Sequence, residues 1–164
     1  MTGNDPGAVA RGIMDANLYM VLATADASGR PWASPVYFAH AGYVELFWVS
    51  SPEATHSRNI AVRPEVSVVI FDSQVPIGAG QGVYLAAVAE ELAGAELERG
   101  LEVFSRRSLA TGGEAWAPDE VSGAAAFRLY RATASEHSML AKDGTADHRV
   151  VVDVHPRDGR QAGP

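Results

Sequence analysis

The sequence predicts a mainly β fold, an antiparallel β-barrel with short helical insertions. Apolar and β-branched segments recur along the chain, and clusters of Asp, Ser and Gly separate one segment from the next. Segments with helical periodicity are few and short, so most connections between strands are turns. Strands joined in this way pair antiparallel and commonly close into a barrel, which removes exposed sheet edges.

The first half of the chain contains one predicted helix and four predicted strands. Apolar residues at helical spacing predict the helix over residues 6–17. The strands are expected at residues 19–24, 32–39, 43–49 and 65–71. Residues 65–71 are almost all apolar or β-branched, which is typical of a strand covered on both faces.

The second half contains a long strand, a surface helix and two final strands. These elements are expected at residues 82–92 (strand), 94–111 (helix), 124–133 and 149–154 (strands). A loop is predicted over residues 135–147, and the polar residues 156–164 predict a frayed tail. We therefore expect one domain spanning residues 1–164, with a helical segment over residues 1–17 at its start.

Composition narrows the functional classes. The chain has 164 residues, 47% of them hydrophobic, which is enough to bury a full core. A net charge of −7 argues against a nucleic-acid partner, because an acidic surface repels the phosphate backbone. No apolar run reaches the roughly 18 residues of a membrane span, and the first residues lack the pattern of a secretory leader. We expect a cytoplasmic protein with no membrane partner.

Cysteine and histidine content limits the chemistry further. The chain has no cysteine, so it has no disulfide framework and no thiol nucleophile. Its five histidines do not show the spacing of metal ligands, so no metal site is expected. Any redox chemistry therefore depends on a bound cofactor.

A polar segment between the third and fourth strands carries the most informative chemistry. It predicts a short helix, with Ser51 as the N-cap and Pro52 as the first helical residue. The free amides of a first helical turn favour an anion. Spacing of three and four residues places Thr55, Arg58 and Asn59 on one helical face. These groups outline a phosphate pocket, although a polar helix between two strands is also common as a solvated connector.

The segment from Met20 to Asp72 resembles the pyridoxamine 5'-phosphate oxidase-like family of flavin-binding split barrels. The resemblance rests on the order LATADASGRPWASPV, then HSRN on the short helix, then VSVVIFD on the fourth strand. It continues more weakly to Glu91 and from Phe127 to Val154. It implies a Greek-key split barrel of six to seven strands, and a homodimer with FMN at the interface between the two copies.

The resemblance also implies which residues contact the cofactor. These are Ser34, Pro35, Val36, Val49, Ser50, Ser51, Thr55, His56, Arg58, Asn59 and Gln81. The flavin phosphate is expected at the end of the third strand and on the helix after it, where His56 replaces the family's usual lysine. Ser34, Pro35 and Val36 would place strand backbone along the isoalloxazine edge. Gln81 corresponds to a glutamine near the flavin.

The chain departs from the true pyridoxamine-phosphate oxidases at its C-terminus. It ends DVHPRDGRQAGP and lacks their Arg-x-His motif, so that activity is not expected. We expect an FMN-binding oxidoreductase that passes hydride between flavin and a small, unidentified substrate, with no acid or base assigned. A deazaflavin-dependent reductase and a non-catalytic flavin carrier or sensor are the alternatives. The aromatic residues Trp32, Tyr37, Phe38, Phe47 and Trp48 exceed what one small interior absorbs, which also favours a dimer.

Overall fold

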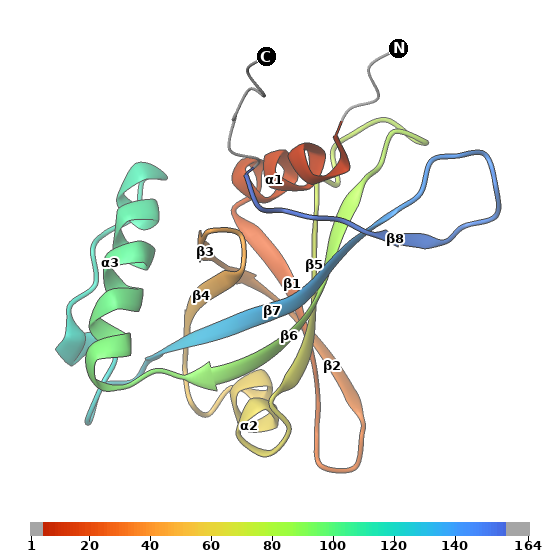
Figure 1. Cartoon of the computed structure of the whole chain (residues 1–164). Coiled ribbons are helices and arrows are strands. Elements are labelled where there is room, and N and C mark those ends of the chain that lie inside the picture. Colours follow the sequence, from red (N-terminus) through yellow and green to blue (C-terminus); the bar gives the residue numbers. More distant parts are fainter. Residues whose placement is uncertain (1–4, 157–164) are drawn as a thin grey trace, which may run out of the picture.

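Apolar runs and the turns between them set the boundaries of the helices and strands (Figure 1). The structure is a computed structural model, and it describes residues 5–156. The elements in chain order are α1 (Pro6–Ala16), β1 (Tyr19–Ala25), β2 (Pro31–Tyr37), β3 (Ala39–Ala41), β4 (Glu45–Ser50), α2 (Thr55–Val62), β5 (Glu65–Phe71), β6 (Gly82–Glu91), α3 (Gly94–Ala110), the 3-10 turn η1 (Pro118–Glu120), β7 (Arg128–Leu140) and β8 (Arg149–Val151).

The strands form one antiparallel sheet that curls into a half-barrel (Figure 1). Its order is β2-β1-β5-β6-β7-β4-β3, and β8 pairs with the last residues of β7. Because β2 lies at one end of this order and β3–β4 at the other, the barrel is split between them. The predicted split barrel is therefore confirmed. The described residues form eight strands rather than six or seven, because the short β3 is separate from the second predicted strand.

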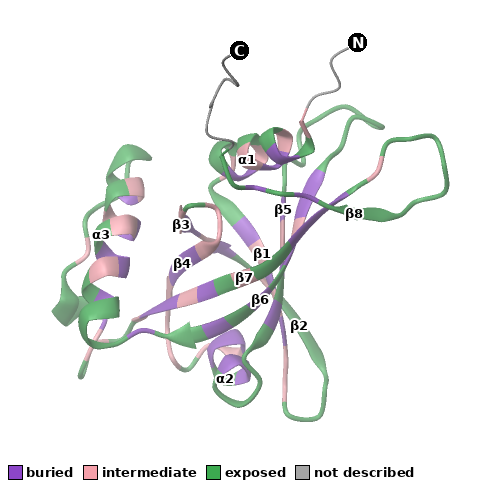
Figure 2. Cartoon of the chain, viewed as in Figure 1, coloured by how far each residue is buried: buried purple, intermediate pink, exposed green. Residues whose placement is uncertain are grey.

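The two faces of the sheet differ in burial (Figure 2). The inner row, side by side across β1, β5 and β6, consists of Leu22, Val68 and Leu85, each at most 1% exposed. The outer row, one residue away on the same strands, consists of Val21, Val69 and Tyr84, each partly exposed. Residues 65–71 alternate between the two faces, and only the inner face is buried. The prediction that this strand is covered on both faces is therefore wrong for the single chain.

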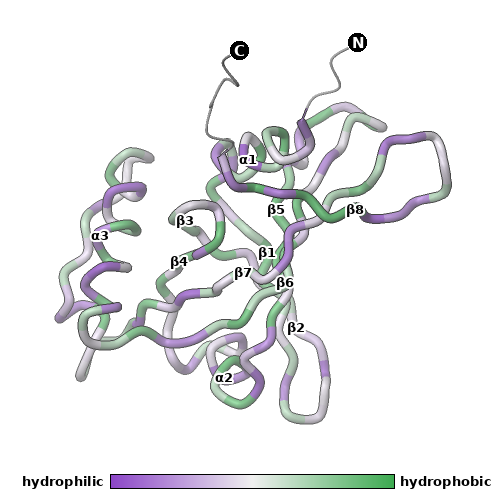
Figure 3. Tube along the Cα trace, viewed as in Figure 1, coloured by the Kyte–Doolittle hydropathy of each residue, from purple (hydrophilic) through white to green (hydrophobic). Residues whose placement is uncertain are grey.

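Helix α3 covers a second, smaller core beside β3 and β4. Hydrophobic and hydrophilic residues alternate along this helix (Figure 3), and Leu97, Leu101 and Phe104 form its buried face. At Gly100 an added Cβ would lie 2.9 Å from the side chain of Leu129. The absence of a side chain at this position therefore allows the helix to approach the sheet closely.

A network of charged side chains joins α3 to the sheet. Arg131 of β7 forms ion pairs with Glu45, Glu90 and Glu96. Arg99 of α3 pairs with two of the same carboxylates, Glu45 and Glu96. The hydrogen bond from Arg99 holds the pKa of the Glu45 carboxyl below its usual range. Shared partners make such a network more effective than isolated surface pairs.

The second half of the sheet differs from the prediction. β7 continues to Leu140, so residues 135–140 are strand and not loop. A register shift after Ala86 keeps this part of β7 paired with β6. The polar residues there belong to a strand that is only partly buried. Ser135 and Glu136 are exposed, whereas His137 is buried. β8 ends at Val151, three residues earlier than predicted.

The predicted N-terminal helix is confirmed as α1, whereas three of the five aromatic residues expected to exceed the interior are fully buried. Phe38, Phe47 and Trp48 are each 0% exposed, because they divide between the two cores, and Trp32 is exposed. No helix among the described residues has the length and hydropathy needed to cross a membrane. Apart from Pro156, the predicted frayed tail lies outside the described residues.

Candidate functional site

His56 bridges the split between the two ends of the sheet. Its Nδ1 lies 3.3 Å from the hydroxyl of Ser34 on β2, and its Nε2 lies 2.9 Å from the hydroxyl of Ser50 on β4. The indole N–H of Trp32 donates to the same Ser34 hydroxyl at 3.0 Å. We call Ser34, Ser50 and His56 the seam cluster. The structure thus brings together three of the predicted site residues from separate parts of the chain.

The charge of His56 depends on its surroundings. Burial lowers the pKa of its imidazole below the ordinary value. At neutral pH the ring is therefore uncharged, and one ring nitrogen donates while the other accepts. A bound anion acts in the opposite direction, because negative charge beside an imidazole favours its protonated form. The seam cluster thus combines two hydroxyls with a group that an anion can convert to a cation.

The residues of α2 point in different directions. Asn59 is buried and donates from Nδ2 to the hydroxyl of Thr24 on β1 at 3.0 Å. Arg58 is exposed and pairs at 3.7 Å with Glu53, which is also exposed. The prediction that Thr55, Arg58 and Asn59 share one face is therefore wrong. Neighbouring helical positions differ by about 100°, so the inward hydrogen bond of Asn59 turns Arg58 outward.

The start of α2 also differs from the prediction. The helix begins at Thr55 and its N-cap is Ala54, which has no side-chain capping bond. Residues 51–54 form a turn in which the Ala54 amide donates to the Ser51 carbonyl at 3.1 Å. The Ser51 hydroxyl accepts from the amide of Glu53 within this turn at 3.2 Å. Ser51 therefore caps a turn, and Pro52 lies before the helix.

The remaining predicted residues of β2 and β4 lie near the split. Pro35 is exposed on the outer face, opposite Val21 of β1. Val36 is in the main core, and Val49 is half-buried on β4. These positions are consistent with strand backbone beside a ligand, and their contact with a cofactor stays a prediction.

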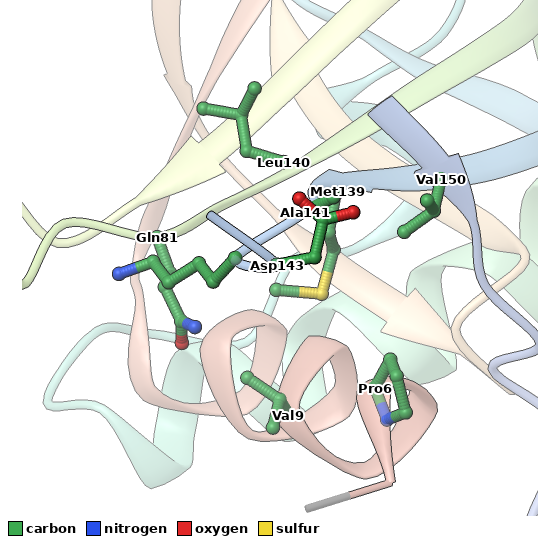
Figure 4. A pocket seen from close by; sticks show the side chains of 9 residues that line it. Pro6, Val9, Gln81, Met139, Leu140, Ala141, Asp143 and Val150 are labelled. Atoms are coloured by element: carbon green, nitrogen blue, oxygen red, sulfur yellow. The ribbon is translucent and has the colours of Figure 1, made fainter. Parts of the chain in front are cut away.

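Gln81 lies far from the seam cluster, at the α1 end of the molecule (Figure 1). There it lines a hollow of about 560 Å³ with Val9 of α1, Met139 of β7 and Val150 of β8 (Figure 4). β6 begins one residue later, and its last residue, Glu91, lines a different hollow together with residues of α2. At about 3.3 Å per residue, the two ends of this strand are about 30 Å apart. The chain therefore does not bring Gln81 together with the other predicted residues.

Two polar residues that hold the site were absent from the prediction. Trp32 orients Ser34, and Thr24 accepts the hydrogen bond of Asn59. The first could have been inferred, because residues two apart on a strand share a face. The second could not, because it joins residues 35 positions apart through the packing of α2 against β1.

Two other histidines, the buried His137 and the half-buried His40, have structural partners. His40 lies 3.0 Å from the Asp15 carboxylate on α1, and the Nε2 of His137 lies 2.8 Å from the carbonyl of Tyr43. Burial lowers the pKa of both imidazoles. Within residues 5–156, no three His, Asp or Glu side chains gather in a way that could hold a metal ion.

The sequence of residues 8–141 matches the family described as pyridoxamine 5'-phosphate oxidase. Because this match covers most of the chain, the chain belongs to this flavin-binding family. No curated protein matches the chain.

Several solved structures share the fold. A heme-binding protein from Mycobacterium smegmatis has a TM-score of 0.71 and 23% identity, over 92% of this chain and 60% of that one. The heme storage protein HutZ from Vibrio cholerae has a TM-score of 0.62 and 23% identity, over 78% of this chain and 89% of that one. A FAD-binding protein from Mesorhizobium loti has a TM-score of 0.57 and 22% identity, over 80% and 90%. This chain thus spans about 60% of the length of the Mycobacterium protein, and the likeness shows the fold alone.

Proposed function

We propose that the chain is a flavin-dependent oxidoreductase that binds FMN at the seam cluster. The observation that carries the proposal is the family match over residues 8–141, combined with the hydroxyl and imidazole groups gathered at the split of the barrel. When bound, the isoalloxazine ring supplies hydride transfer to a small substrate. The chain contributes hydrogen bonds, orientation and exclusion of water.

The polar groups near the split fit a phosphate monoester. Hydroxyls of Ser50 and Thr55 can donate to its oxygens, and a dianion beside His56 raises the imidazole pKa and makes it a cation. Arg58 takes no part, because it faces away and pairs with Glu53. The phosphate charge would then be balanced by His56, so FMN affinity falls as pH rises through the bound-state pKa of this residue.

We also propose that each FMN is bound between two copies. One argument is the outer face of the sheet, where the partly exposed Val21, Val69 and Tyr84 adjoin the exposed Phe71. The other argument is Gln81, which is too far from α2 for both to touch one flavin in a single chain. A two-fold axis lying in the plane of this interface, perpendicular to β6, would place Gln81 of each copy near the split of the other.

Mixed dimers provide the test of this shared site. His56→Ala and Gln81→Ala each weaken both sites of a homodimer. A mixed dimer of the two variants keeps one site with both native residues, so it should bind one FMN per dimer with the wild-type dissociation constant. Mixed dimers with two weakened sites and no tight site would show that both residues serve the same copy's site. Two sites of wild-type affinity in each single-variant homodimer would show that neither residue binds flavin.

The alternatives within flavin chemistry differ in cofactor and turnover. Mass spectrometry of the small molecule released on denaturation separates FMN from a deazaflavin. A deazaflavin with a longer acidic tail would need basic residues beyond His56 near the phosphate. Tight FMN binding with no reduction by any nicotinamide donor would favour a carrier or sensor over an oxidoreductase.

Heme binding is a second candidate, favoured by the hollow beside α1. Its walls include the apolar Val9, Met139 and Val150. Residues 141–143 also line it, and the same loop contains His148, whose side chain is about half exposed. Two of the structures that share the fold are heme proteins. Titration with hemin separates the candidates: stoichiometric hemin binding that is lost in His148→Ala, without FMN binding, would replace the flavin proposal.

A further inference from the structure

The indole of Trp32 lies on the inner face of β2, beside the split. It shares this face with Ser34 and with Val36 of the main core, because alternate residues of a strand point the same way. Val36 is 8% exposed, whereas Trp32 is 47% exposed. A hydrogen bond of 3.0 Å runs from its Nε1 to the Ser34 hydroxyl. The ring is thus open to solvent and is connected to the seam cluster through its N–H.

This hydrogen bond sets the role of the Ser34 hydroxyl. An indole N–H can only donate, so the Ser34 oxygen accepts from Trp32. An oxygen that already accepts one hydrogen bond becomes a better donor and a poorer second acceptor, because hydrogen bonds in a chain polarise one another. Within the described part of the chain, the acceptor in reach of the Ser34 hydrogen is Nδ1 of His56, at 3.3 Å.

The two tautomers of neutral His56 differ in how well they fit this arrangement. With hydrogen on Nε2, the Ser34 hydroxyl donates to Nδ1, and Nε2 donates to the Ser50 oxygen at 2.9 Å. With hydrogen on Nδ1, both Trp32 and His56 point donors at the Ser34 oxygen, and the Ser34 hydrogen has no acceptor in the cluster. The first arrangement pairs more of the hydrogens, so the geometry favours it.

We propose that Trp32 is a positioning residue whose N–H holds His56 in the tautomer with hydrogen on Nε2. The bond from Nε2 to Ser50 is then already formed before a ligand arrives, and the hydrogen of the Ser50 hydroxyl is free to donate outward. Nδ1 is left as the ring nitrogen that can take up a proton. The tautomer is a property of the chain alone, whereas its use in FMN binding rests on the proposed function.

A bound phosphate then changes the role of one hydroxyl. When the dianion converts His56 to a cation, a proton from solution adds to Nδ1, which becomes a donor to Ser34. Both lone pairs of the Ser34 oxygen are then occupied, one by Trp32 and one by His56. The Ser34 hydrogen is released, so it can donate to the phosphate, as the Ser50 hydrogen already can. The seam cluster therefore gains one donor on binding, and Ser34 is the residue that switches.

Imidazole ¹⁵N NMR spectra of the full chain without FMN test the tautomer directly. Protonated and bare ring nitrogens have well-separated shifts, and the signals of His56 are those that disappear in His56→Gln. At neutral pH, where burial keeps this ring uncharged, Nε2 should carry the hydrogen and Nδ1 should not. Hydrogen mainly on Nδ1 in the wild-type chain would overturn the proposal.

Trp32→Phe keeps an aromatic ring at this exposed position and removes the N–H. The fraction of His56 with hydrogen on Nδ1 should then rise several-fold, because Ser34 accepts from Nδ1 without a competing donor. Trp116→Phe is the matched control, since Trp116 packs against Phe104 and Phe127, away from the seam cluster. It should leave the tautomer of His56 unchanged. Equal tautomer fractions in the two variants would also overturn the proposal.

The same spectra with FMN added separate this inference from the proposed function. FMN should protonate Nδ1 of His56 and leave the hydrogen on Nε2 in place. A bound flavin that leaves Nδ1 bare would contradict a phosphate at the seam cluster, while the tautomer of the FMN-free chain would still support the role of Trp32.

Discussion

The two faces of the β1–β5–β6 sheet carry similar residues but have different surroundings. Leu22 and Val68 on the inner face are 0% exposed, whereas their chain neighbours Val21 and Val69 remain partly open. Hydrophobicity alone does not distinguish these rows, because both are apolar. The difference teaches that the inner row stabilises the single chain, while the outer row is available to a second copy.

The largest expected effect is on the inner face. Leu22→Ala should lower the free energy of unfolding by about 2–5 kcal/mol, because it opens a cavity in the core. Val21→Ala, its neighbour on the outer face, should cost less than about 1 kcal/mol in the monomer. Urea denaturation at low protein concentration measures both, and equal losses would contradict the assignment of the faces.

The same contrast exists on α2. Asn59→Ala removes a buried hydrogen bond to Thr24 and should destabilise the chain by about 1–3 kcal/mol. Arg58→Ala removes only an exposed pair and should change stability by less than about 0.5 kcal/mol. A larger loss for Arg58→Ala, measured by the same denaturation, would show that Arg58 supports the fold.

A charge placed on the outer face tests whether that face is the dimer interface. Val69→Lys places a cation in the middle of the proposed interface and should raise the dimer dissociation constant roughly tenfold or more. The monomer should lose no more than about 1 kcal/mol, because the site is open in the single chain. Sedimentation velocity over a concentration series gives the dissociation constant. Leu109→Lys, at an exposed apolar residue of α3, is the matched control and should leave the dissociation constant unchanged.

The smallest effect concerns pH and three histidines, of which His56 and His137 are buried and His40 is half-buried. Burial lowers the folded-state pKa of His40, His56 and His137, whereas in the unfolded chain each titrates near about 6.5. Below that pH the unfolded state binds more protons, so the free energy of unfolding should fall as pH decreases. His56→Gln should make this fall shallower in urea melts from pH 7.5 to 5.5. An unchanged slope would mean that His56 titrates normally.

Most of the fold could be predicted, because it depends on local patterns. Strand boundaries for residues 19–24 and 65–71 follow from apolar runs bounded by turns, and the helix at residues 94–111 follows from its period. Burial of the two faces was mispredicted for residues 65–71, because the apolar run from Val68 to Phe71 outweighed the alternation marked by the exposed Glu65 and Ser67. The strand at residues 135–140 was missed because its polar side chains resemble those of a loop.

The candidate site was only partly predictable. Ser34, Ser50 and His56 were identified as site residues, but their meeting depends on the closing of the sheet, which brings β2 toward β4. The direction of Arg58 depends on a hydrogen bond from its neighbour Asn59 to a distant strand. Spacing along one helix contains no information about such a contact.

The central claim is that one flavin is shared between two copies, with the seam cluster of one and Gln81 of the other. Analytical ultracentrifugation of the full chain with FMN, followed at the visible absorbance of flavin, tests it most directly. The account predicts that flavin sediments with the dimer, that added FMN shifts the monomer–dimer equilibrium toward the dimer, and that His56→Ala reduces both effects. Flavin that sediments with a monomer, with no shift toward the dimer, would contradict the account.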